Sequence, residues 1–285
     1  MLATLIIVFR EVLEAALIVS IVAAATKGVA GRGRWLSAGI VGGLAGASLV
    51  AIFASAISNA VEGTGQEIFN ASVLFLAVVM LGWHNVWMGS HGRQLAIEMK
   101  EVGHDVTVGT KPLYALAIVV GAAVMREGSE VVLFLNGIAS GGVGNSAMLA
   151  GGLLGIAAGG ALGFALYFGL LRLSLNMLFR VTGWMILLLA AGMAAQGAKF
   201  LVQGGFLPPL GGIMWNSSWL LSESSLIGQT LHTLIGYTAR PLPIQAIFYV
   251  ATLLVIGGLM KIVGNGVSSK AKARSTTAAG PVAGD

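Results

Sequence analysis

The sequence carries the same charged pattern twice, Arg-Glu-x-x-Glu, at residues 10–14 and again at residues 126–130. Glutamates three positions apart lie on one face of a helix, and the arginine lies one turn from the second glutamate. Each copy therefore forms a patch of two carboxylates and one guanidinium within an apolar stretch. A charge at the centre of a membrane helix costs about 3 kcal/mol on insertion scales, so these side chains should face each other or water rather than lipid.

The chemistry of these two patches is that of a cation site. Four carboxylates and two guanidiniums carry a formal charge of −2, which one divalent cation would neutralise. Oxygen ligands suit hard or borderline ions such as Fe, Mn, Mg or Ca. We therefore predict a shared metal site near the middle of the membrane, supported by Arg10 and Arg126, with these ligands: Glu11, Glu14, Glu127 and Glu130.

The elements that position these residues must be membrane helices. Only 9% of the 285 residues are charged and 56% are hydrophobic, whereas a soluble domain has about 25% charged residues. This excludes a water-soluble globular enzyme, and the lack of cysteine excludes disulfides and thiolate metal sites. A bilayer span needs about 20 apolar residues, so we predict an all-α polytopic membrane protein with seven transmembrane helices: 2–25, 35–58, 68–90, 113–137, 147–170, 181–203 and 244–263.

The basic residues set the expected orientation. Twelve of the sixteen lysines and arginines fall on one side of the predicted spans, two on the other side and two within helices. Cytoplasmic loops carry the excess of basic residues in membrane proteins. We therefore expect a multi-pass protein of the inner (plasma) membrane, with the N-terminus outside and the C-terminus cytoplasmic. The bilayer is then its surrounding, and nucleic acid is not expected as a partner because no basic stripe is present.

The charged motifs belong to an internal repeat, because Gly39 and Gly43 also recur, as Gly151 and Gly155. Units of three spans have opposite orientations, so we predict an inverted 3+3 repeat plus a C-terminal helix. We expect the second and fifth helices to pack closely through these glycines. The predicted membrane domain spans residues 1–263, with repeat one at about 1–110 and repeat two at about 111–205. An outer loop at 205–243, which contains an interfacial helix at 222–237, then leads to helix seven at 244–263. We predict that residues 264–285 form a disordered cytoplasmic tail.

Arg-Glu-x-x-Glu in the first and fourth of seven spans resembles the high-affinity iron permease family, which includes ferroxidase-linked fungal permeases and EfeU-type bacterial permeases. Residues 82–88, 215–223 and 231–237 are also similar, and the resemblance extends to about Val263. It implies that the four motif glutamates bind iron during transport. It further implies iron as the substrate, no permanently bound cofactor, no enzymatic activity, and a separate extracytoplasmic protein that oxidises or delivers iron.

Four other polar residues are candidates for the ion path. His84 could be a ligand or a proton relay, or could only hydrogen-bond across helices, and Asn85 is its natural companion. Gln196 could line the path, and Glu223 in the outer loop could attract cations or simply be solvated.

The residues leave rival functions open beside an iron ion transmembrane transporter. The same carboxylates could carry protons in a proton-coupled transporter of another divalent metal cation. A membrane di-iron oxidase also uses facing glutamates, but such sites have Glu-x-x-His on two helices, whereas both motifs here have Glu-x-x-Glu. A structural subunit that only anchors an oxidase would leave the charged motifs unexplained.

Overall fold

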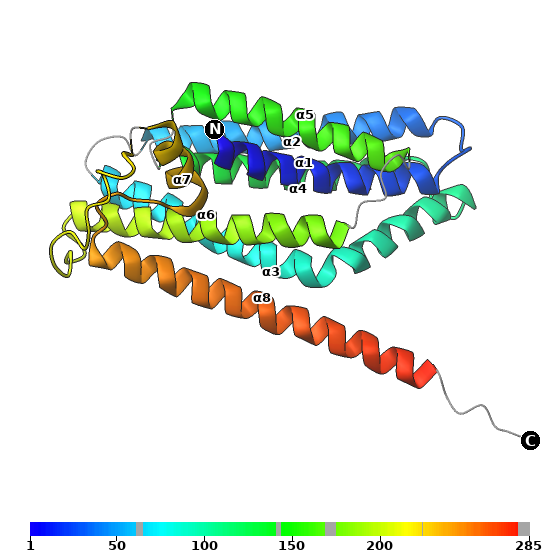
Figure 1. Cartoon of the computed structure of the whole chain (residues 1–285). Coiled ribbons are helices and arrows are strands. Elements are labelled where there is room, and N and C mark those ends of the chain that lie inside the picture. Colours follow the sequence, from blue (N-terminus) through cyan, green and yellow to red (C-terminus); the bar gives the residue numbers. More distant parts are fainter. Residues whose placement is uncertain (61–64, 141–143, 169–174, 224, 279–285) are drawn as a thin grey trace, which may run out of the picture.

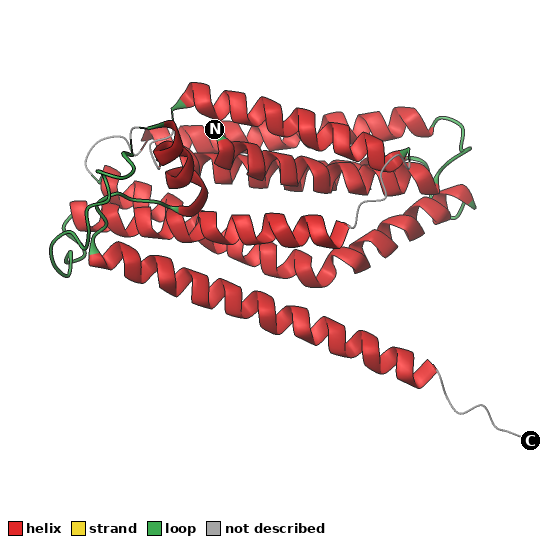
Figure 2. Ribbon diagram, viewed as in Figure 1, coloured by secondary structure: helices red, strands yellow, loops and turns green. Residues whose placement is uncertain are grey.

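The computed structural model describes residues 1–60, 65–140, 144–168, 175–223 and 225–278, and every regular element in these ranges is a helix (Figure 2). The predicted all-α class is therefore confirmed. The helices are α1 (Leu2–Ala25), α2 (Arg32–Ala60), α3 (Gln66–Thr107), α4 (Tyr114–Ser140), α5 (Asn145–Tyr167), α6 (Leu175–Gln203), α7 (Leu226–Ile235) and α8 (Pro243–Ala278).

Helices α1 to α6 lie side by side in a bundle, and α8 runs obliquely away from it toward the C-terminus (Figure 1). The short helix α7 covers the end of the bundle where the N-terminus lies, and it contacts α1 and α6. The C-terminal end of α8, at Ala278, lies toward the opposite end of the bundle (Figure 1). The two ends of the bundle are therefore distinguishable by α7 on one side and by the end of α8 on the other.

Two helices are longer than the predicted spans. Helix α3 continues to Thr107 rather than ending near residue 90, and α8 continues to Ala278 rather than ending at Val263. Residues 264–278, expected to belong to a disordered tail, are therefore helical. Apolarity marks only the part of a helix that suits a bilayer, and neither extension contains a proline that would end the helix.

Five of the described helices are long and apolar enough to cross a membrane, namely α2, α3, α5, α6 and α8. Helices α1 and α4 are of comparable length but carry the charged motifs near their middles. Every stretch of 18 residues within either helix includes all three charges of its motif. Hydropathy alone therefore does not mark these two helices as spans.

Glycines bring two helices very close to the motif helices. A Cβ atom at Gly43 of α2 would lie 2.7 Å from the backbone oxygen of Gly121 in α4. A Cβ atom at Gly155 of α5 would lie 2.9 Å from the backbone oxygen of Leu5 in α1. Only glycine allows such an approach of two backbones. The expectation that the second and fifth helices pack closely through these glycines is confirmed, and the partner of each glycine row is a motif helix, α4 for α2 and α1 for α5.

An apolar layer closes the bundle between α1, α3 and α4 on the N-terminal side of the first motif. Ile7, Leu81 and Phe134 are each fully buried, and they belong to one core cluster that extends onto α6. Burying an aliphatic or aromatic side chain of this size contributes about 1.5–3 kcal/mol relative to exposure to water. The layer is thus a fully buried, apolar part of the bundle.

Helix α7 is held by caps and by α6. The Ser225 hydroxyl accepts a hydrogen bond from the Gly228 N–H at 3.0 Å, which satisfies a free donor at the helix start. The helix ends at Gly236, whose φ of +71° lies in the left-handed region that favours glycine. A Cβ atom at Gly192 of α6 would lie 2.6 Å from the Gly236 Cα. The end of α7 therefore rests directly on the α6 backbone.

Candidate metal site

Helices α1, α3 and α4 bring four possible metal ligands to one point. One carboxylate oxygen from each of Glu11, Glu127 and Glu130 and one ring nitrogen of His84 lie within 4.8 Å of one another. Oxygen ligands lie about 2.0–2.6 Å from a bound ion. Atoms at this separation can therefore share a single ion, and we call these four residues the acidic cluster.

The first motif is a fully buried ion-pair network on α1. Arg10 Nε lies 3.0 Å from Glu14 Oε1, one turn along the helix, and Arg10 Nη1 lies 3.5 Å from Glu11 Oε1. All three side chains are at most 3% exposed. Charges buried to this degree need close partners, so the guanidinium both compensates and orients the two carboxylates.

The second motif repeats this geometry on α4 in a more open setting. Arg126 Nε lies 3.1 Å from Glu130 Oε1 and 3.8 Å from Glu127 Oε1. The Arg126 side chain is 37% exposed, whereas that of Arg10 is 3% exposed. The Arg126 guanidinium lies 4.6 Å from the centre of the Trp87 ring, which stabilises it through a cation–π contact. Trp87 was not among the predicted site residues, although its spacing from His84 places both on one face of α3.

His84 joins the two motifs. Its Nε2 lies 3.3 Å from Glu14 Oε2 and 3.8 Å from Glu11 Oε2, while its Nδ1 contacts Glu130 Oε2. The ring is 2% exposed. The imidazole of α3 is therefore in position to link the carboxylates of α1 to those of α4, and it can supply the only nitrogen ligand of the acidic cluster.

Several buried carboxylate oxygens in this region accept no well-directed hydrogen bond from the described residues, namely Glu11 Oε2, both oxygens of Glu14, Glu127 Oε2 and Glu130 Oε2. Those of Glu14 and Glu130 are in contact with the Arg10 and His84 side chains, in the ion pairs given above. Buried polar atoms in folded proteins are nearly always hydrogen-bonded. A group of buried carboxylate oxygens with unused hydrogen-bonding capacity around an imidazole fits a cation site, and mixed oxygen and imidazole ligation suits borderline ions, of which iron is one.

A cavity of about 540 Å³ reaches the acidic cluster from one end of the bundle. Its lining includes Glu11 and Glu127 of the cluster, and also Ala23 and Tyr167 near the C-terminal ends of α1 and α5. Its remaining walls are almost entirely apolar. The cavity thus extends from the cluster toward the end of the bundle opposite α7, while the apolar layer described above lies on the other side of the cluster.

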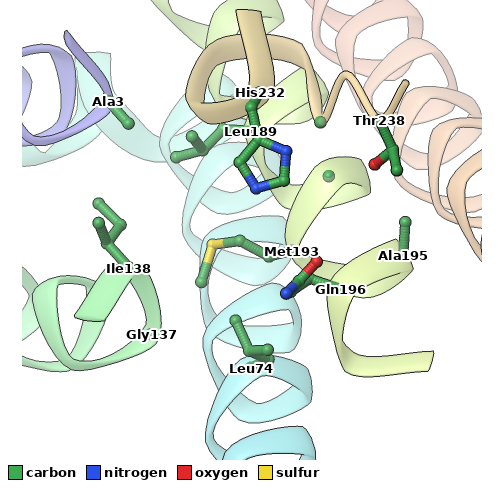
Figure 3. Close-up of a pocket in the computed structure, with 12 residues that line it drawn as sticks. Ala3, Leu74, Gly137, Ile138, Leu189, Met193, Ala195, Gln196, His232 and Thr238 are labelled. Carbon is green, nitrogen blue, oxygen red and sulfur yellow. The ribbon is translucent and has the colours of Figure 1, made fainter. Parts of the chain in front are cut away.

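The other three path candidates lie outside the acidic cluster. Asn85 donates a hydrogen bond to the Gly183 carbonyl at 2.9 Å and so ties α3 to α6. Glu223 accepts a hydrogen bond from the Ala239 N–H and so braces the loop around α7. Gln196 lines a separate, smaller cavity next to α7 (Figure 3).

The fold and the site together are those of a multi-pass membrane protein with a buried cluster of carboxylates and one imidazole. The model of the Iron permease FTR1 family matches residues 1–272. The chain therefore belongs to this family, and the resemblance seen in its motifs is confirmed.

The curated relatives carry names of the same kind. The ferrous iron permease EfeU of Escherichia coli O157:H7 is 36% identical over 239 residues, which is 82% of this chain and 86% of the relative. The ferrous iron permease EfeU of Yersinia pestis is 32% identical over 82% of this chain and 84% of the relative. A protein of Escherichia coli strain K12 named as a putative inactive ferrous iron permease EfeU is 35% identical over the same share of this chain. No solved structure matches the chain.

Proposed function

We propose that this chain is an iron permease that imports iron across the plasma membrane through the acidic cluster. The observation that carries the proposal is the convergence of Glu11, His84, Glu127 and Glu130 within 4.8 Å of one another at a buried point. The family match and the relatives named as ferrous iron permeases support iron as the ion. Glu14, which contacts His84, is then a further ligand as the ion arrives or leaves.

The two arginines orient the carboxylates of the site and allow a bound ion to be released. Arg10 and Arg126 each hold the second glutamate of their motif at 3.0–3.1 Å, which fixes the carboxylates before an ion arrives. They also limit the negative charge that the ion meets. Conduction requires binding that is strong enough for entrance and weak enough for release, and a net charge near −2 serves both.

Seven spans arranged as an inverted repeat are part of this proposal, with α1 and α4 crossing beside the five apolar helices and α7 at the surface. Two corresponding contacts support the repeat. A Cβ atom at Gly43 would lie 2.7 Å from Val124 Cβ, and one at Gly155 would lie 2.8 Å from Val8 Cβ. The two glycines are 112 residues apart and the two valines are 116 residues apart, as in the repeated sequence.

Transport would proceed by alternating access around the cluster. With the N-terminus outside and the C-terminus in the cytoplasm, the 540 Å³ cavity extends from the cluster toward the cytoplasmic ends of α1 and α5. The layer of Ile7, Leu81 and Phe134 then closes the outer side. Rocking of one repeat against the other would open the layer and close the cavity.

The permease acts without a permanently bound cofactor, and iron is its cargo. A separate extracytoplasmic protein that oxidises or delivers iron would supply the ion, as the resemblance to the iron permease family implies. A proton-coupled transporter of another divalent metal cation uses the same carboxylates, and competition by excess manganese or zinc during uptake separates the two.

Uptake of radiolabelled ferrous iron into proteoliposomes tests the proposal. Glu127→Gln should abolish uptake, because it removes a ligand without adding a buried charge. Glu98→Gln is the matched control, since Glu98 is an exposed α3 carboxylate bonded to Gln94. Both proteins should elute from size exclusion as the unmodified protein does. Full uptake by the Glu127 variant would refute the acidic cluster as the transport site.

A further inference from the structure

A second cavity lies between α7 and the bundle (Figure 3). Its lining residues Ala3 and Ile138 are farther along α1 and α4 from the acidic cluster than Ile7 and Phe134 of the apolar layer. Its volume of about 50 Å³ is enough for one small ion with little water. His232 of α7 and Met193 and Gln196 of α6 supply side-chain ligand atoms to its wall. None of its lining residues is acidic.

His232 is held in the manner of a metal ligand. Its Nδ1 lies 2.7 Å from the Tyr237 carbonyl oxygen, which can only accept a hydrogen bond. Nδ1 therefore carries the proton, and in the neutral ring the lone pair lies on Nε2. An N–H bond to a backbone carbonyl is the contact that orients ligating histidines in metal proteins. Figure 3 shows the ring over Met193 and Gln196 in the cavity.

The two α6 residues complete a neutral ligand set. Met193 and Gln196 are three positions apart and so share one face of the helix. They offer a thioether sulfur and an amide oxygen beside the imidazole nitrogen. Neutral nitrogen and sulfur ligands favour a borderline ion such as Fe²⁺ over the hard, oxygen-seeking Fe³⁺.

We propose that His232, Gln196 and Met193 form an outer binding station that receives ferrous iron before it reaches the acidic cluster. The proposal rests on the transport function and direction argued above. Under this proposal the ion that arrives at the outer side is Fe²⁺. A partner protein that oxidises the ion would then act only after this step.

The spacing of the two sites suits a relay. Ala3 of α1 and Ile138 of α4 line the outer cavity. Ala3 lies eight residues before Glu11 on α1, and Ile138 lies eight residues after Glu130 on α4. At 1.5 Å per residue this is a separation of roughly 12 Å along the bundle. A neutral station binds an ion more weakly than a negatively charged cluster does, so the ion moves inward once the layer of Ile7, Leu81 and Phe134 opens.

Equilibrium dialysis of the purified full-length protein in nanodiscs against Fe²⁺, without oxygen, tests the station. The unmodified protein should bind one ion at each site. His232→Leu should lose one ion per chain, and His104→Leu, a change at an exposed histidine of α3, should lose none. Met193→Leu conserves the side-chain volume and should lower the affinity of the outer station for Fe²⁺ by about tenfold or more. This second variant tests the station even if the His232 variant does not fold.

The acidic cluster is tested separately in the same assay. Glu127→Gln should lose the other ion and retain the one that depends on His232. If neither the His232 nor the Met193 variant changes iron binding, the outer station is overturned while the cluster stands. If only the Glu127 variant is without effect, the cluster fails as a binding site and the outer station stands.

Discussion

Alanine at Gly43 should loosen the contact between α2 and the motif helix α4, whereas alanine at the neighbouring Gly42 should not. A Cβ atom at Gly43 would lie 2.7 Å from the Gly121 oxygen and 2.7 Å from Val124 Cβ, but nothing lies within 4 Å of a Cβ atom at Gly42. The two substitutions are chemically identical and adjacent, so their difference isolates the helix contact.

The expected difference follows from these distances. Ordinary Cβ contacts begin near 3.4 Å, so the α4 backbone must move by roughly 0.7 Å, and overpacking of this kind costs about 1–3 kcal/mol. Replacing glycine by alanine in a helix contributes up to about 1 kcal/mol of stability, and this contribution cancels between the two variants. Gly43→Ala should therefore be about 1–3 kcal/mol less stable than Gly42→Ala.

Thermal unfolding in detergent, followed together with iron uptake, measures the effect. Gly43→Ala should unfold at a lower temperature and transport less, since α4 carries half of the acidic cluster. The corresponding pair on α5 should behave alike: Gly155→Ala destabilises, and Gly160→Ala, with open space around it, does not. Equal stability within both pairs would show that the close glycine contacts do not hold the motif helices.

Two further predictions concern the side chains around the cluster. Arg126→Lys should reduce uptake despite its conserved charge, because lysine lacks the planar guanidinium that contacts Glu130 and covers Trp87; unchanged kinetics would make Arg126 a simple counter-charge. His84→Gln should weaken Fe²⁺ binding by about tenfold or more and reduce the preference for Fe²⁺ over Mg²⁺, since the only nitrogen ligand of the cluster is lost. Competitive dialysis measures that preference, and an unaltered ratio would leave His84 a purely structural role.

Much of the site geometry could be anticipated because it is local. The ion pairs of Arg10 with Glu14 and of Arg126 with Glu130 follow from helical spacing within one helix. The repeat of motif and glycines predicted which helices correspond. Whether the motif glutamates bind iron stays a prediction, since the contacts alone do not test it.

The contacts between helices could not be read in the same way. Sequence spacing does not fix the rotation of α3 about its axis, so nothing in it showed that His84 faces both motifs while Asn85, one position on, faces α6. The glycine rows of α2 and α5 were recognisable as packing faces, but their partners depend on the three-dimensional order of the bundle. Apolarity does not predict where α3 and α8 end, because both helices continue as polar segments beyond their apolar stretches, to Thr107 and Ala278.

The charges within α1 have a consequence for how the nascent chain enters the bilayer. Its thirteen leucine, isoleucine, valine and phenylalanine residues favour insertion by about 4–8 kcal/mol, and three charges oppose it by about 9 kcal/mol. Helix α1 alone is therefore a poor membrane segment. Its close partner α5 begins some 120 residues later, which at about 5–20 residues per second takes roughly 6–24 s of synthesis. Helix α1 thus should become firmly embedded only after later helices are made to cover it, so its insertion depends on the second half of the bundle.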